Sequence, residues 1–554
     1  MLLIVGWDGA SFDVVGPMLK AGELPNLAEL LERSACRRLR STTPAVTFPA
    51  WTSFMTAASP GYHGILDFSF RPDHSYSVRF VNGSYRRLPT IWRRMSDAGL
   101  RVGVYALPAT YPAETLHGVQ VCGFDTPFGT GKGSKFSYPN GLIAEIEKRY
   151  GGIAVDGPSQ SRLGAGWYHH ALEQMLETID LRAKIVCDLL TNGNFDCFCV
   201  HFGESDTVAH HFWQFDDAGS PRSRLDGPAG GIKDVYRGMD RALGRLLEAV
   251  PDGGSVMLVS DHGSGGASDR VIFWNRWLAD EGFLRFTGTS SFRDAAFGAA
   301  RKAALRAVPE SVQARLFGRL RRTAGTLEAA SRFRGIDWRH TRVFSEELNY
   351  YPALWINRLG REPCGTVEEA AVQPLVAELG DRLRAWKDPI DGGPVVERVM
   401  VRGELFEGPY ANLAPDLVLQ LRDPDGYSYC AMPSRGGAER NPIRRMRDEE
   451  MVGRRGTTMS GSHRPYGMCT LAAPGVRPGR CEDTTLPDAG ATVLALMGIE
   501  HSQEADGVQW GESRPKGSSS SSIISNADPM IYAREEEAEV VRRLRALGYL
   551  DGEG

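Results

Sequence analysis

The sequence has few cysteines, little net charge and no long apolar run. Its nine cysteines, in 554 residues, form no CxxC pair, so we expect reduced thiols and a cytoplasmic protein. The formal net charge of −4 argues against a protein that mainly coats nucleic acid. The N-terminal run "LLIVGW" is shorter than a signal sequence or membrane span requires. We therefore expect no membrane partner.

What the sequence does contain is an alternation of short apolar runs and helical patterns. The strand-like runs are residues 2–7, 101–107, 196–202 and 255–260, and later 352–357 and 416–421. The stretch 231–249 has apolar residues at helical spacing and suits a crossover helix. Such alternation predicts an α/β fold, with a mostly parallel sheet flanked by helices.

Composition divides the chain into five parts. Residues 1–282 and 342–514 carry the α/β pattern, and residues 283–341 are Ala-rich and basic, which predicts an inserted helical cap. A solvated basic face without a ligand is the alternative for this insertion. Residues 515–530 are serine-rich and predict a flexible linker, and residues 531–554 predict a C-terminal helix.

Three of the strand-like runs are followed by an acidic residue. Asp8 follows the first run, Asp206 comes a few residues after 196–202, and Asp261 follows 255–260. Parallel strands bring their carboxyl ends to one edge of the sheet, where ligands bind. Each aspartate alone could equally begin a loop, but three at equivalent ends predict a shared site.

Histidines accompany these aspartates. His210 follows Asp206 by four residues, so both face one side of a helical turn, and His211 points elsewhere. Asp261 and His262 are adjacent oxygen and nitrogen donors, whereas His463 lies in a glycine-flanked loop with no spacing signal of its own. Mixed Asp and His ligands favour zinc, with manganese or iron as alternatives.

Thr47, in "PAVTFPAW", lies where a helix begins, with Pro49 in its first turn. A hydroxyl there could be an ordinary helix cap. It could instead be a nucleophile, because helix N-termini favour phosphate and a two-metal clamp would lower the pKa of the hydroxyl.

These residues and their order resemble a known family. After the first strand come "TFPAW", "SPGYHG", "DTVAH", "SDHG" and "SHRPYG". The chain resembles the alkaline phosphatase superfamily, specifically the type I phosphodiesterase/nucleotide pyrophosphatase branch and its phosphohydrolase group. The resemblance covers nearly the full length, apart from the basic insertion and the linker. It implies an alkaline-phosphatase-like core.

The resemblance also implies a two-metal phosphoester hydrolase, a phosphodiesterase or phosphatase. One divalent ion would be held by Asp206, His210 and His463, and the other by Asp8, Asp261 and His262. Thr47 would contact both ions and form a covalent phosphothreonine intermediate with a small soluble phosphoester.

One departure from the family bears on the substrate. Nucleotide pyrophosphatases carry an asparagine at the position of Phe68, which argues against the familiar nucleotide pose. A phosphoryl or phospho-alcohol transferase with the same nucleophile is an alternative, and a non-catalytic anion-binding scaffold is another. Arg321 and Arg322, in the insertion, are candidate contacts for an anionic leaving group.

Overall fold

The computed structural model describes most of the chain. The described residues are 1–127, 135–155, 157–158, 166–287, 332–348, 350–451, 459–500, 505–510 and 532–546. Most of the expected insertion, all of the expected linker, and Arg321 and Arg322 lie outside these ranges, so the division of the chain there stays a prediction. Within these ranges, no helix has both the length and the apolar composition needed to cross a bilayer.

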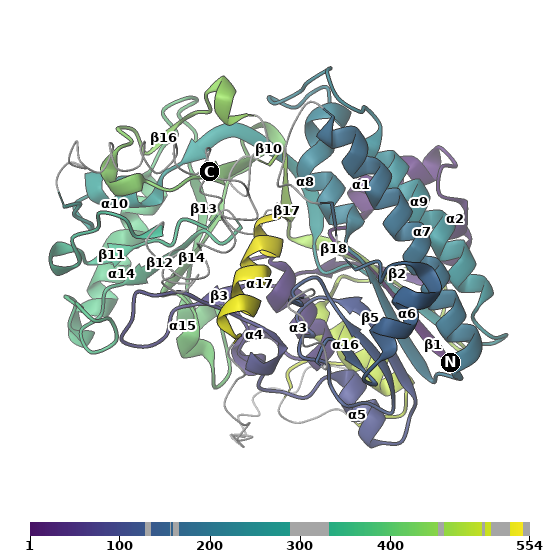
Figure 1. Cartoon of the computed structure of the whole chain (residues 1–554). Coiled ribbons are helices and arrows are strands. Elements are labelled where there is room, and N and C mark those ends of the chain that lie inside the picture. The colour runs from purple at the N-terminus through teal and green to yellow at the C-terminus, as the bar shows by residue number, and fades with distance from the viewer. Residues whose placement is uncertain are drawn as a thin grey trace.

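In the part of the chain that the structure describes, a mixed, mostly parallel sheet of 10 strands forms the centre of the fold (Figure 1). Neighbouring strands in the order β9, β1, β8, β5 and β6 are parallel, whereas β18 is antiparallel to both β9 and β2. The main strands are β1 (Leu2–Trp7), β2 (Ala35–Arg40), β5 (Val102–Leu107), β6 (Gly118–Cys122), β8 (Cys197–Phe202), β9 (Ser255–Val259) and β18 (Tyr466–Ala472). Short edge strands are β7 (Ser137–Tyr138), β19 (Gly479–Arg480) and β20 (Thr484–Thr485). The first four predicted runs are β1, β5, β8 and β9, which confirms the predicted α/β fold.

Helices cover both faces of this sheet. In β1, Leu3, Val5 and Trp7 face one hydrophobic cluster, whereas Leu2 and Ile4 face another, as the two-residue period of a strand requires. The first face is covered by α1 (Phe12–Lys20), α2 (Pro25–Glu32), α6 (Leu142–Tyr150), α7 (Trp167–Gly193) and α9 (Gly231–Glu248). The second is covered by α3 (Thr47–Thr56), α5 (Ile91–Asp97) and α16 (Leu486–Leu496).

A second part of the molecule, on the left in Figure 1, has a separate hydrophobic cluster. The later runs 352–357 and 416–421 are strands here, but they pair antiparallel instead of joining the central sheet. This sheet contains β11 (Val343–Phe344), β12 (Ala353–Ile356), β13 (Val396–Val401) and β14 (Leu417–Leu421), with α10 (Trp274–Asp280), α14 (Glu369–Ala385) and the short α15 (Arg402–Leu405) nearby. A further sheet contains β10 (Gly263–Ile272), β15 (Ser428–Ala431), β16 (Ile443–Arg445) and β17 (Gly461–Arg464).

Further elements are α4 (Pro60–His63), β3 (Ser69–Phe70), β4 (Arg79–Phe80), α8 (Glu204–Asp216) and α17 (Arg534–Ala546). Of these, α8 packs on the first face of the central sheet, where its Val208 and Phe212 join the hydrophobic cluster. The C-terminal helix α17 appears in yellow between the two parts in Figure 1. Its Val540 and Leu544 are buried in one cluster with Val46 and Phe48, the two neighbours of Thr47.

Candidate active site

The three strand-end aspartates come together at one edge of the central sheet. Asp8 directly follows β1, Asp206 lies in the first turn of α8 after β8, and Asp261 follows β9. Because β1 pairs with both β8 and β9, these residues are brought to neighbouring positions. All three are almost fully buried, with exposures of 1%, 3% and 0%.

Asp8, Asp261 and His262 form one group that could hold a metal ion. His262 Nε2 lies 3.5 Å from Asp8 Oδ1 and 3.2 Å from Asp261 Oδ2. Neither of those oxygens accepts a hydrogen bond from the described residues. Burial, together with the negative charge of Asp8, raises the pKa of the Asp261 carboxyl well above its ordinary value. Buried carboxylates held this close fit a cation between them.

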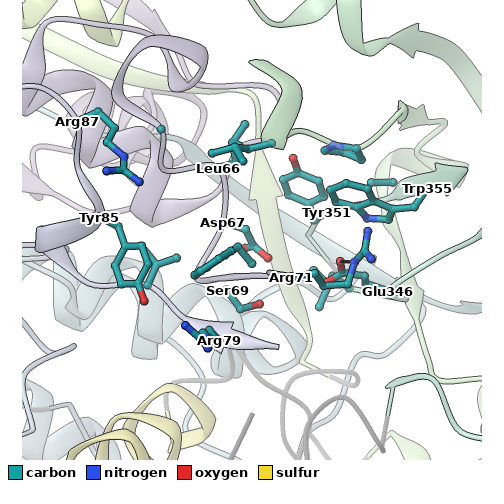
Figure 2. Close-up of a pocket in the computed structure, with 17 residues that line it drawn as sticks. Leu66, Asp67, Ser69, Arg71, Arg79, Tyr85, Arg87, Glu346, Tyr351 and Trp355 are labelled. Atoms are coloured by element: carbon teal, nitrogen blue, oxygen red, sulfur yellow. Dashed lines mark hydrogen bonds and ion pairs between the residues drawn. The ribbon is translucent and has the colours of Figure 1, made fainter. Parts of the chain in front are cut away.

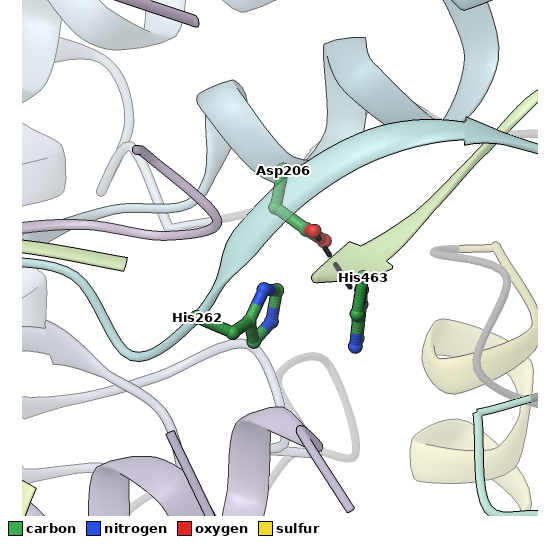
Figure 3. A group of neighbouring side chains, drawn as sticks. All are labelled: Asp206, His262 and His463. Atoms are coloured by element: carbon green, nitrogen blue, oxygen red, sulfur yellow. Dashed lines mark ion pairs between the residues drawn. The ribbon is translucent and has the colours of Figure 1, made fainter. Parts of the chain in front are cut away.

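Asp206, His262 and His463 form a second such group (Figure 3). His463 Nε2 lies 3.5 Å from Asp206 Oδ1, and the His262 and His463 rings stack with centroids 3.7 Å apart. His210 Nε2 is 3.1 Å from Asp206 Oδ1 and 3.1 Å from His463 Nε2. The structure therefore brings together the expected set Asp206, His210 and His463, with His262 beside it. The division of these side chains between two ions stays a prediction.

All three histidines turn the same nitrogen toward the group. Their Nδ1 atoms lie at hydrogen-bond distance from backbone carbonyls: His210 at 3.1 Å from Gly461, His262 at 3.0 Å from Gly263, and His463 at 2.7 Å from Ala45. A carbonyl only accepts, so each contact places the proton on Nδ1 and leaves the Nε2 lone pair directed at the aspartates. This arrangement is typical of metal-binding histidines.

Burial and neighbouring charge oppose each other at Asp206 and act in the same direction at His463. Burial alone would raise the pKa of the Asp206 carboxyl, but the adjacent His210 and His463 hold it below its ordinary value. Burial and the neighbouring His262 hold the pKa of His463 well below its ordinary value, which favours the neutral, ligating ring.

Thr47 is the first residue of α3 and is fully buried. Its Oγ1 lies 3.4 Å from Nε2 of His262, the residue that belongs to both candidate metal groups. The residue before it, Val46, has extended backbone at the N-cap position, so Thr47 stands where helix N–H groups have no partner within the helix. The hydroxyl thus lies beside the candidate metal ligands and at a terminus that favours negative charge.

Sequence reasoning missed the residues that hold Asp8. Asp8 Oδ2 accepts hydrogen bonds from His201 Nε2 at 2.8 Å and from Trp51 Nε1 at 3.0 Å. His201 lies within β8 and carries no spacing signal, although its position level with Gly6 in β1 follows from the strand pairing. Tyr350 was also missed: its ring stacks on His463 with centroids 4.2 Å apart.

Two further expectations concern side chains at the margin of the site. His211 lies on another side of α8, as expected, with its ring 5.3 Å from that of Trp167. Phe68 is buried, and its ring centroid is 4.2 Å from that of Phe48, the neighbour of Thr47. An ungapped count from Thr47 places this ring at the position of the family's asparagine, and that correspondence stays a prediction.

Comparisons with known proteins identify the family of the chain. A family model described as type I phosphodiesterase/nucleotide pyrophosphatase matches residues 2–456. The crystal structure of phosphonoacetate hydrolase from Sinorhizobium meliloti 1021 with phosphonoacetate is 16% identical, with 89% of this chain and 95% of that chain covered and a TM-score of 0.51. Murine ectonucleotide pyrophosphatase/phosphodiesterase 5 is 12% identical, with 90% of this chain and 95% of that chain covered and a TM-score of 0.45. The chain belongs to the type I phosphodiesterase/nucleotide pyrophosphatase family, in the alkaline phosphatase superfamily, and is a hydrolase of that family.

Proposed function

We propose that this protein hydrolyses a small soluble phosphoester, with Thr47 as the nucleophile and two divalent metal ions as cofactors. The observation that carries the proposal is the 3.4 Å distance between Thr47 Oγ1 and Nε2 of His262, the residue common to both candidate metal groups. The proposed ligands are Asp206, His210 and His463 for one ion, and Asp8, Asp261 and His262 for the other.

The residues present fit such ions. Asp8 Oδ1 and Asp261 Oδ2 accept no hydrogen bond from the described residues. Such carboxylate oxygens, together with imidazole nitrogens that have a free lone pair, are the ligand atoms that zinc prefers, and manganese or iron is the alternative. When bound, the ions would lower the pKa of the Thr47 hydroxyl and neutralise charge on the transferring phosphoryl group.

The chain itself supplies the nucleophile and its orientation. Thr47 Oγ1 attacks phosphorus, the bond from phosphorus to the ester oxygen breaks, and the alcohol leaves. Water then attacks the phosphothreonine, which releases phosphate, or a phosphomonoester when the substrate is a diester, and restores the hydroxyl. The N-terminus of α3 favours the negative charge of the phosphoryl oxygens, while His201 and Trp51 fix Asp8.

Phe68 bears on the substrate. Its buried ring offers no hydrogen bond to a phosphoryl oxygen, which favours a phosphoester other than a nucleotide held in the familiar pose. The transferase alternative shares the first half-reaction and differs only in the acceptor. Zinc as the ion in the cell and a cytoplasmic location stay predictions.

Steady-state kinetics test this proposal. Metal-loaded protein is assayed with bis-p-nitrophenyl phosphate, p-nitrophenyl phosphate and a nucleotide p-nitrophenyl ester, each with and without an alcohol acceptor. Thr47→Ala should abolish turnover while about two ions stay bound. Thr52→Ala, in the same helix and equally buried, is the control and should stay active. Turnover by Thr47→Ala would contradict the nucleophile, and a phosphorylated alcohol product would identify a transferase.

A further inference from the structure

A cavity lies between the segment 64–87 and the second part of the molecule (Figure 2). Its volume is about 420 Å³, which is within the usual range for a small-molecule pocket. None of the residues that line it is a candidate metal ligand. The cavity is therefore built from a different set of side chains than the candidate active site.

The walls of the cavity are mainly apolar. They come from the loops around α4 and β3 on one side and from β12 and its flanking loops on the other. The apolar lining residues include Leu66, Phe70, Val81, Leu348, Ala353 and Trp355. A wall of this composition accepts an aromatic or aliphatic body.

A buried hydroxyl on this wall has no partner. Tyr351 is only 6% exposed, and its hydroxyl makes no hydrogen bond to any described residue. Burial, with the charges of Asp67 and Glu346, raises the pKa of Tyr351 well above its ordinary value, so the hydroxyl keeps its proton. The hydroxyl oxygen is itself covered by protein, so Tyr351 contributes the rest of its side chain to the wall and its hydroxyl is not open to a ligand in the cavity.

Two arginines on the lining are available for an anion. Arg79 and Arg87 form no ion pair with a carboxylate in the described ranges, whereas Arg71 is bound to Glu346 at 3.0 Å. Figure 2 shows Arg79 and Arg87 on the side of Tyr85, across the cavity from Trp355. A guanidinium group binds carboxylate, phosphate and sulfonate groups through paired hydrogen bonds.

We propose that this cavity is a second binding site, which takes a small organic anion with an aromatic or aliphatic body. The body lies against Trp355 and the other apolar side chains of the wall, and the anionic group binds the guanidinium group of Arg79 or of Arg87. This site is independent of the proposed hydrolysis, because it uses neither Thr47 nor the candidate metal ligands.

The probe for this site is 8-anilinonaphthalene-1-sulfonate, an aromatic anion that fluoresces in apolar surroundings. Titration of the full-length folded protein should give one bound probe per chain. N-phenyl-1-naphthylamine, which lacks the sulfonate, should bind at least about fivefold more weakly. Arg79→Glu should weaken sulfonate binding about five- to tenfold. Arg33→Glu, at an exposed position that ends α2, is the matched control and should bind like the wild type.

A second variant separates a ligand role from a structural one. Arg87→Glu should bind the sulfonate probe more weakly without lowering the urea midpoint of unfolding, because Arg87 lines the cavity and forms no ion pair with a carboxylate in the described ranges. Thr47→Ala should bind the probe unchanged, even if no hydrolysis is found. The absence of stoichiometric binding, or equal affinity in the wild type, Arg79→Glu and Arg87→Glu, would overturn the proposal.

Discussion

His201 should control metal affinity without being a ligand. The carboxylate of Asp8 turns Oδ1 toward His262 Nε2, at 3.5 Å, and accepts two hydrogen bonds at Oδ2, from His201 and Trp51. His201→Phe removes one of these two donors but keeps an aromatic ring where His201 meets Trp51, with centroids 5.1 Å apart. A hydrogen bond to a charged group contributes about 1.5–3 kcal/mol, which corresponds to roughly 10- to 100-fold in affinity.

The assay is competition with a chromophoric chelator, together with metal content and circular dichroism on the same samples. His201→Phe should bind zinc about 10- to 100-fold more weakly while it stays folded, and His201→Gln, which restores a donor, should recover part of the loss. His211→Phe is the matched control, because His211 is also buried but packs on Trp167. Wild-type zinc affinity in folded His201→Phe would refute the reasoning.

Three further predictions follow from packing and charge. Phe68→Asn should raise turnover of a nucleotide ester relative to bis-p-nitrophenyl phosphate, and an unchanged ratio of the two rates would count against the role given to this position. Because it removes a buried ring, the same substitution should lower the free energy of unfolding by about 2–4 kcal/mol. Leu544→Ala should lower the free energy of unfolding by about 2–5 kcal/mol in urea titrations, because Leu544 is fully buried beside Thr47's neighbours; no loss would mean that α17 does not dock as described. Burial raises the pKa of Asp125 to about 7, above its unfolded value, so this carboxyl should remove up to about 4 kcal/mol of stability as pH rises from about 4 to 7. Asp125→Asn should therefore show a smaller fall in urea midpoint over that range, and an identical pH profile would contradict the assigned shift.

The sequence predicted the parts of the site that follow from strand direction. Asp8 directly follows β1 and Asp261 lies two residues after the end of β9, and parallel pairing alone brings them together. The helical spacing of Asp206 and His210 likewise predicted their contact, now seen at 3.1 Å. These features depend on local sequence and on one topological rule.

Other features depend on contacts between distant segments. His201 was missed because its role comes from the alignment of β8 with β1, which brings its ring to Asp8. The runs 352–357 and 416–421 were predicted as strands, but apolar patterning does not specify a partner, and they form a separate antiparallel sheet. Tyr350 reaches His463 only because this second part packs against the central core.

The central claim is that Thr47 becomes phosphorylated during turnover. The most direct measurement is peptide mass spectrometry of acid-quenched, metal-loaded enzyme during steady-state turnover of the best substrate from the kinetic panel. The account predicts one added phosphoryl group on the peptide that contains Thr47, and its absence from Thr47→Ala. Turnover with phosphate found on another residue, or undiminished turnover by Thr47→Ala, would contradict it.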